Sequence, residues 1–132
     1  MRIEDYFQQI TESVNACANL QVSRVTYEKR STHEGFIRGE LHFVDSSVLH
    51  VREYVDVETA PDRLLYVYQY MDGSGNLIFR YDNSGHHRKL NLATYPHHKH
   101  VGDDNKIVAS DAPTLAHTLK EIEHRTLALC DG

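Results

Sequence analysis

Apolar residues recur every three or four positions at the start of the chain. This spacing places them on one face of an α-helix, and it predicts a helix over residues 3–18. The apolar positions are Ile3, Phe7, Ile10, Val14 and Cys17. Because Cys17 lies on this face, we expect a small buried side chain there rather than a reactive thiol.

The period of the pattern then changes to two, which is typical of β-strands with one buried face. A first strand is predicted from Val22. Residues 36–43 and 48–57 both alternate, and the turn signal at residues 45–47 predicts that they form an antiparallel hairpin. The inward positions of this hairpin are Ile37, Leu41, Phe43, Leu49, Val51, Val55 and Val57.

Glu53 interrupts the inward face of this hairpin. Alternation puts it on the same side as Val51 and Val55, where an unpaired carboxylate would be costly. One interpretation is a buried ion pair with Arg80 that supports the arginine. The alternative is a strand bulge, which would shift the pattern by one residue and turn Glu53 outward.

A second hairpin and a final helix complete the pattern. Residues 63–71 form a strand with Tyr66, Tyr68 and Tyr70 on one side, and the glycine-containing turn at residues 72–75 leads into a strand over 76–82. A polar loop is predicted from residue 84 to about 105. The last helix is predicted to have Ser110 or Asp111 as its N-cap and Pro113 in its first turn. Its inward positions are Leu115, Leu119, Ile122, Thr126 and Leu129.

These elements predict an α+β fold, in which an antiparallel sheet of about five strands is flanked by an N-terminal and a C-terminal helix. The two helices would cover one face of the sheet and leave the other face polar, and that second face is where we expect the functional site. The pattern has no βαβ alternation, glycine-rich phosphate loop or nucleophile elbow. It therefore argues against a Rossmann domain, a P-loop enzyme and an α/β-hydrolase.

Length and composition restrict the class further. A chain of 132 residues with 40% hydrophobic positions predicts a single domain over residues 1–132. Its longest apolar runs are only a few residues, so we expect no membrane span, no secretory signal and a cytoplasmic location. Cys17 and Cys130 are the two cysteines, too few for a disulfide scaffold or a four-thiolate zinc site.

The charge of the chain is unevenly distributed. The formal net charge is −5, yet the segment over residues 80–106 has more basic than acidic residues. Five of the ten histidines fall within fifteen residues of this segment, at positions 86, 87, 97, 98 and 100. An anionic ligand would be attracted here, and more strongly as the imidazoles become protonated near neutral pH.

Two motifs in this segment resemble a known family. The first motif is the run Arg80-Tyr81-Asp82-Asn83 with the following pair His86-His87, and the second is the run Pro96-His97-His98-Lys99-His100. Both are similar to motifs of TumE-like toxins of prokaryotic type II toxin–antitoxin systems. The resemblance extends from the hairpin around Glu53 to His100. It implies a toxin encoded beside a cognate antitoxin, commonly one with a helix-turn-helix domain, but it does not identify the reaction.

The side chains of the segment favour cleavage of RNA without a metal. Imidazoles near their ordinary pKa suit both proton transfers of that reaction, and fixed cations stabilise the charged transition state. If the second motif is extended, His98 and His100 share one side while His97 and Lys99 point to the other. We expect His98 and His100 to be the acid and base, and His86 or His87 to enter from the preceding loop.

Other residues have predicted roles around this centre. Arg80, Arg88 and Lys99 would bind the phosphate. A splayed base could stack on Tyr66, Tyr68 or Tyr70, although these tyrosines could equally pack beneath a helix. Supporting roles fall to Glu53, Tyr81 and Asp82, with Asp82 in a turn that directs His86 and His87 toward Arg80.

Three alternatives to this mechanism remain open. His98, His100, one histidine of the 86–87 pair and a carboxylate would make a set of ligands for a divalent metal, and metal-assisted phosphodiester cleavage would also suit a toxin that acts on RNA. The chain could instead be a non-catalytic module that engages its antitoxin. Finally, the histidines could be solvated loop residues without any chemical role.

Overall fold

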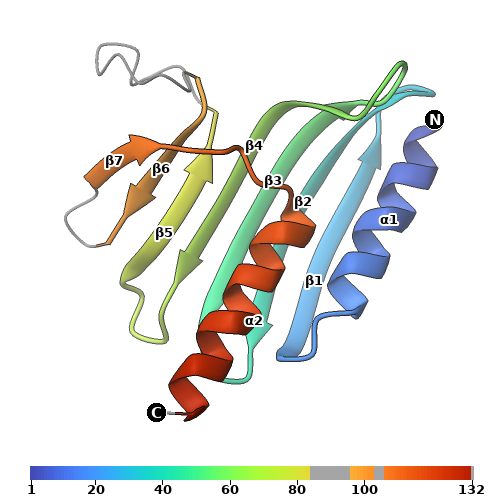
Figure 1. Cartoon of the computed structure of the whole chain (residues 1–132). Helices are drawn as coiled ribbons and strands as arrows, with labels where there is room; N and C mark the ends of the chain where they lie inside the picture. The colour runs from blue at the N-terminus through green and yellow to red at the C-terminus, as the bar shows by residue number, and fades with distance from the viewer. Residues whose placement is uncertain (84–95, 103–105, 132) are drawn as a thin grey trace.

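The computed structural model describes residues 1–83, 96–102 and 106–131, with side chains up to residue 125. Within these ranges a helix is followed by seven strands and a second helix (Figure 1). The elements are α1 (Ile3–Asn15), β1 (Leu20–Lys29), β2 (Glu34–Phe43), β3 (Val48–Asp56), β4 (Asp62–Met71), β5 (Leu77–Asp82), β6 (His98–Val101), β7 (Lys106–Ala109) and α2 (Leu115–Asp131). The strands form one antiparallel sheet in the order β1-β2-β3-β4-β5-β6-β7.

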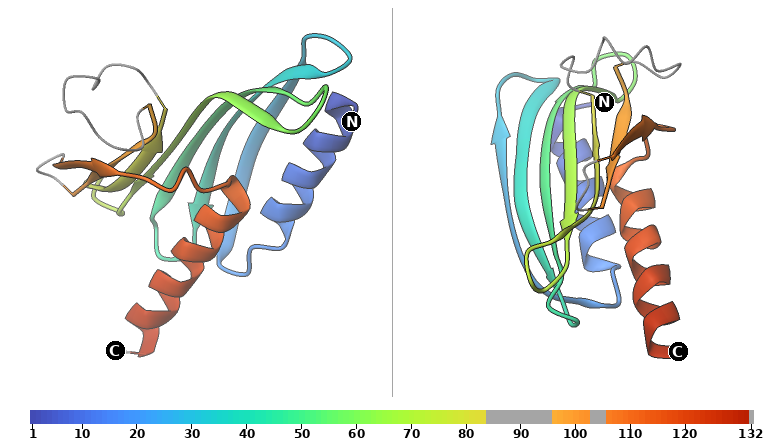
Figure 2. Two further views of the ribbon diagram at one scale, coloured as in Figure 1. Left: turned by 45° about the horizontal axis from the view of Figure 1, so that its top comes forward. Right: turned by 90° about the vertical axis from the view of Figure 1, so that its left-hand side faces the viewer.

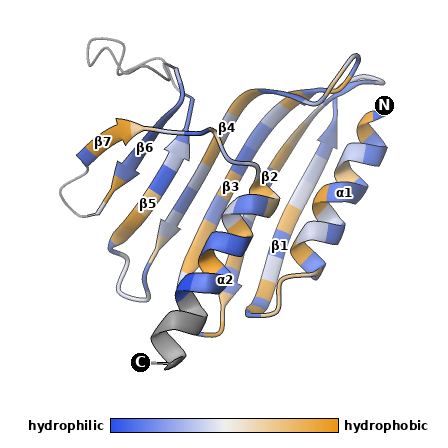
Figure 3. Ribbon diagram, viewed as in Figure 1, coloured by the Kyte–Doolittle hydropathy of each residue, from blue (hydrophilic) through white to orange (hydrophobic). Residues whose placement is uncertain are grey.

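The two helices lie on the same face of the sheet, as the side view in Figure 2 shows. This arrangement confirms the predicted α+β class. Hydrophobic and hydrophilic residues alternate along the strands (Figure 3), and the predicted inward positions of β2 and β3 are all buried. Because successive strand residues point to opposite faces, the opposite set of side chains lies on what we call the helix-free face.

The core forms between α1, α2 and the inward strand residues. α1 buries Ile3, Tyr6, Ile10 and Val14, so Tyr6 joins the predicted stripe. The helix ends at Asn15 rather than residue 18, and Cys17 lies just beyond it. Cys17 is buried as predicted, and this burial raises the pKa of its thiol to about 11, which suits an unreactive core residue.

The sheet has two more strands than the sequence indicates. β6 falls within the region predicted as a polar loop, and β7 begins directly after that region. The prediction of about five strands is therefore wrong. Its physical cause is that the buried positions of β6 are His98 and His100 rather than aliphatic residues, so the strand has no apolar alternation.

The C-terminal helix begins later than predicted. Its N-cap is Thr114, whose Oγ1 accepts a hydrogen bond of 3.1 Å from the backbone N–H of His117. Neither Ser110 nor Asp111 caps the helix, and Pro113 precedes the cap instead of lying in the first turn. The predicted inward positions Leu115, Leu119 and Ile122 are buried. Neither of the described helices is long and apolar enough to cross a membrane.

Glu53 is buried in the core beneath the helices, with none of its surface exposed. Its carboxylate accepts hydrogen bonds of 2.5 Å from the hydroxyls of Tyr6 and Tyr68. The predicted ion pair with Arg80 is wrong, because Arg80 lies on the helix-free face, and a bulge that turns Glu53 outward is wrong as well. Burial raises the pKa of the Glu53 carboxyl, although the two tyrosine hydrogen bonds and the nearby Arg63 oppose this effect.

Candidate functional site

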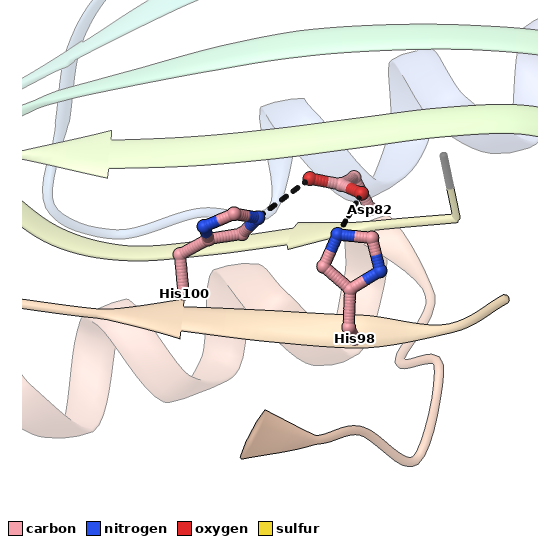
Figure 4. A group of neighbouring side chains, drawn as sticks. All are labelled: Asp82, His98 and His100. Carbon is pink, nitrogen blue, oxygen red and sulfur yellow. Dashed lines mark ion pairs between the residues drawn. The ribbon is translucent and has the colours of Figure 1, made fainter. Parts of the chain in front are cut away.

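Three buried polar side chains meet where β5 and β6 pair (Figure 4). Asp82 is the last residue of β5 and lies opposite His98 of β6, while Arg80 lies opposite His100. The Nε2 atom of His98 is 2.6 Å from Asp82 Oδ1, and the Nε2 atom of His100 is 3.3 Å from Asp82 Oδ2. We call Asp82, His98 and His100 the Asp-His-His cluster.

The cluster lies on the helix-free face, where the sequence predicted function. Its strand neighbours point the other way, since Tyr81 and Lys99 both contact Glu121 of α2. The Tyr81 hydroxyl donates a hydrogen bond of 2.7 Å to Glu121 Oε1, and Lys99 Nζ is 3.6 Å from Glu121 Oε2. The structure thus places Lys99 and Arg80 on opposite faces of the sheet, so it does not bring these two predicted phosphate-binding residues together at the cluster.

Both ring nitrogens of His98 are engaged within the protein. Its Nδ1 is 2.9 Å from the backbone carbonyl oxygen of Pro96. A carbonyl oxygen only accepts hydrogen bonds, so Nδ1 carries a proton. The Nε2 atom is directed at Asp82. This arrangement fixes the orientation of the His98 ring and leaves neither nitrogen directed toward solvent.

Arg80 connects the cluster to the protein surface. Its Nε donates a hydrogen bond of 2.9 Å to Asp82 Oδ2, and its Nη1 donates one of 3.4 Å to Gln69. The Arg80 side chain is 37% exposed, whereas that of Asp82 is 1% exposed. The partner of Arg80 is therefore Asp82 rather than Glu53, and part of its guanidinium stays available to an anionic ligand.

The Asp-His-His cluster supports two kinds of chemistry. A carboxylate that accepts from an imidazole N–H orients the ring and stabilises its protonated form, as an acid–base residue requires. The same groups can ligate a divalent metal, because one donor atom from each residue lies within 4.8 Å of the others. A backbone carbonyl that holds the distal N–H of a histidine, as Pro96 does for His98, is a common support of metal-binding histidines.

The tyrosines predicted to stack on a base lie in the core. Tyr66, Tyr68 and Tyr70 are each at most 1% exposed and face the helices. His97 stacks on Tyr66 with 5.7 Å between ring centroids, and its Nδ1 is 2.9 Å from the Tyr66 hydroxyl. Burial lowers the pKa of His97, and the nearby Arg63 lowers it further. In the structure these three rings therefore pack beneath the helices, which is the alternative to base stacking that the sequence also allowed.

His86, His87 and Arg88 lie outside the described residues. Asp82 was predicted to be the last residue of a strand and the start of the following turn, with a supporting role. It does end β5, and it is the common partner of the cluster. Extending the alternation of β5 from Arg80 by two residues would have placed Asp82 on the face of Arg80, so the signal was present in the sequence.

Comparison with known proteins gives a family but no characterised counterpart. A family model described as toxin TumE matches residues 8–126, which include every residue of the Asp-His-His cluster. No curated protein and no solved structure matches the chain. The match confirms the resemblance predicted from the two motifs.

Proposed function

Because the chain belongs to the TumE toxin family, we propose that it is a toxin that cleaves RNA and that its antitoxin holds it inactive. Membership of a toxin family implies an antitoxin partner, and we propose the helix-turn-helix type for it. RNA cleavage would take place in the cytoplasm. The observation that carries the proposal is the Asp-His-His cluster with Arg80 at its edge.

The proposed reaction is attack of a ribose 2′-oxygen on the adjacent phosphorus. A base removes the 2′-hydroxyl proton, the bond from phosphorus to the 5′-oxygen breaks, and an acid protonates that oxygen. His100 is our candidate for one of these proton transfers. Its Nε2 lies 3.3 Å from Asp82 Oδ2, so Asp82 would orient the imidazole and stabilise its protonated form during the transfer.

The other members of the site have supporting roles. With both of its nitrogens engaged, His98 is better suited to positioning Asp82 than to proton transfer. Arg80 would bind the phosphate oxygens, because a guanidinium matches their geometry and stays charged. The second proton carrier is proposed to be His86 or His87, as the sequence suggested.

A second candidate is metal-assisted cleavage of the same bond. The buried two-histidine, one-carboxylate set and the carbonyl support of His98 favour it specifically. A transition metal held by Asp82, His98 and His100 would supply a Lewis acid next to the phosphate. In that case all three residues would be ligands, and Arg80 would keep its phosphate-binding role.

A cleavage assay with and without chelator tests the proposal and separates the two mechanisms. The purified full-length chain would be incubated with end-labelled RNA in EDTA, and a second sample would receive Zn²⁺ or Mn²⁺ after the chelator is removed. We expect equal cleavage in both samples. Cleavage that requires added metal would establish the second candidate instead. Absence of cleavage in both samples, with the protein folded by circular dichroism, would contradict the ribonuclease proposal.

A further inference from the structure

The strand register aligns polar side chains in two rows across the helix-free face. Each row has one residue from every strand between β1 and β6, and all of its members point to the same side. The first row is Arg24, Glu40, His50, Gln69, Arg80 and His100. The second is Thr26, Arg38, Arg52, Val67, Asp82 and His98. Both rows end at the Asp-His-His cluster.

These rows are basic although the whole chain is acidic. We call Arg24, Arg38, Arg52 and Arg80 the arginine strip. The two acidic residues of the rows are already paired, Glu40 with His42 and His50 and Asp82 within the cluster. Among the ion pairs of the described side chains, none includes the first three arginines of the strip, and all three are exposed. They therefore present positive charge to solvent.

The strip borders a hollow suited to an extended polyanion. An open hollow of about 640 Å³ lies over β1, β2 and β3, and Arg24, Arg38 and Arg52 are among its lining residues. Four interstrand spacings of about 4.8 Å separate β1 from β5, so the strip extends over about 19 Å. A surface of that length accommodates several nucleotides rather than one phosphate.

Two aromatic rings beside the strip could receive bases. Phe36 and Tyr54 lie opposite each other on the helix-free face, with 5.0 Å between their ring centroids. The guanidinium of Arg38 lies 5.4 Å from the centroid of Phe36. Both rings are half-buried, unlike the fully buried tyrosines of β4. Arginines interleaved with accessible aromatics are typical of surfaces that bind single-stranded nucleic acid.

We propose that single-stranded RNA lies across the helix-free face, with its phosphates on the arginine strip and a base against Phe36 or Tyr54, and continues to the Asp-His-His cluster. This inference rests on the proposed function for its choice of RNA. It assigns substrate binding to β1, β2 and β3, far in sequence from the histidine-rich segment.

Binding to an uncleavable RNA tests this inference. The probe is a fluorescent 2′-O-methyl RNA 15-mer, which has no 2′-hydroxyl proton to lose. We expect the variant R24A/R38A/R52A to bind at least about tenfold more weakly in an anisotropy titration, and the slope of log affinity against log salt to decrease by about 2, or about 0.7 per lost phosphate contact. The control R2A/K120A/R125A removes the same charge from exposed positions outside the rows and should bind like the unaltered chain.

Several outcomes would overturn the inference. These are equal affinity of the two triple variants for the probe, no binding of the probe by the unaltered chain, or loss of antitoxin binding by R24A/R38A/R52A while its RNA affinity is retained. The result is independent of the cleavage assay, because the probe cannot react. If R24A/R38A/R52A binds the probe more weakly but the unaltered chain cleaves no RNA, the RNA-binding surface is supported and the ribonuclease proposal is contradicted. If the unaltered chain cleaves RNA but the two triple variants bind the probe equally, the ribonuclease proposal is supported and the RNA-binding surface is contradicted. Thermal unfolding would confirm that both variants are folded.

Discussion

Replacing His100 with alanine is expected to abolish RNA cleavage and growth arrest. A positioned acid or base contributes about 10²- to 10⁴-fold to the rate, and we expect a loss in that range in a purified cleavage assay. The same variant should still form a complex with the antitoxin, because the substitution removes one side chain at the edge of a buried cluster. The measurements are initial cleavage rates, colony formation after induction and co-purification with the antitoxin.

Two neighbours of His100 provide matched controls. His97 and Lys99 belong to the same histidine-rich run but point to the helix-covered face, where they contact Tyr66 and Glu121. We expect His97→Asn and Lys99→Ala to keep cleavage and toxicity. If toxicity survives His100→Ala, the chain is a non-catalytic binding module or acts elsewhere. If Lys99→Ala is inactive while folded, the phosphate contact predicted for Lys99 has to be restored to the mechanism.

Replacing Glu53 with alanine is expected to destabilise the fold by about 3–5 kcal/mol. The substitution leaves a cavity under the helices and removes the acceptor of two buried hydroxyls, those of Tyr6 and Tyr68. Because small domains have total stabilities of about 5–15 kcal/mol, much of the chain would unfold in mild denaturant. Urea unfolding monitored by circular dichroism measures the change, and a loss below about 1 kcal/mol would contradict the packing described for Glu53.

The conservative variant Glu53→Gln separates charge from packing. The pKa of Glu53 is raised in the folded state from its ordinary value of 4.5, so the folded chain retains a proton that the unfolded chain releases. The stabilisation that this retained proton gives the folded state is fully present below pH 4.5, and it is lost as the pH rises through the folded-state pKa of Glu53. The stability of Glu53→Gln relative to the unaltered chain should therefore increase with pH. If the difference in free energy of unfolding between Glu53→Gln and the unaltered chain stays constant as the pH rises above 4.5, the pKa of Glu53 is not raised in the folded state.

The sequence predicts those parts of the fold that depend on apolar periodicity. The stripe of α1, the inward faces of β2 and β3 and the buried end of α2 near Leu115 all follow from the spacing of aliphatic residues. β6 and β7 could not be predicted in this way. The buried residues of β6 are His98 and His100, and both pair with Asp82 of β5. Their burial depends on a polar partner from another strand, and a pattern within one segment cannot reveal that partner.

The histidines of the candidate site and the face of Asp82 could be predicted from the sequence, but the pairing of Asp82 with the histidines could not. Extended geometry correctly places His98 and His100 on one side of β6, with Lys99 on the other. Asp82 becomes the common partner only through the register of β5 against β6. The same holds for the arginine strip, because Arg24 and Arg80 are distant in sequence and come into one row only when five strands pair in order.

Mapping of RNA 5′ ends after controlled expression is the most direct test of RNA cleavage by this chain. Cells expressing the unaltered chain would be compared with cells expressing His100→Ala at equal protein level, before growth slows in either culture. We expect new RNA ends with the unaltered chain and none with the variant, as this mechanism requires. Growth arrest by the unaltered chain without new RNA ends would contradict it.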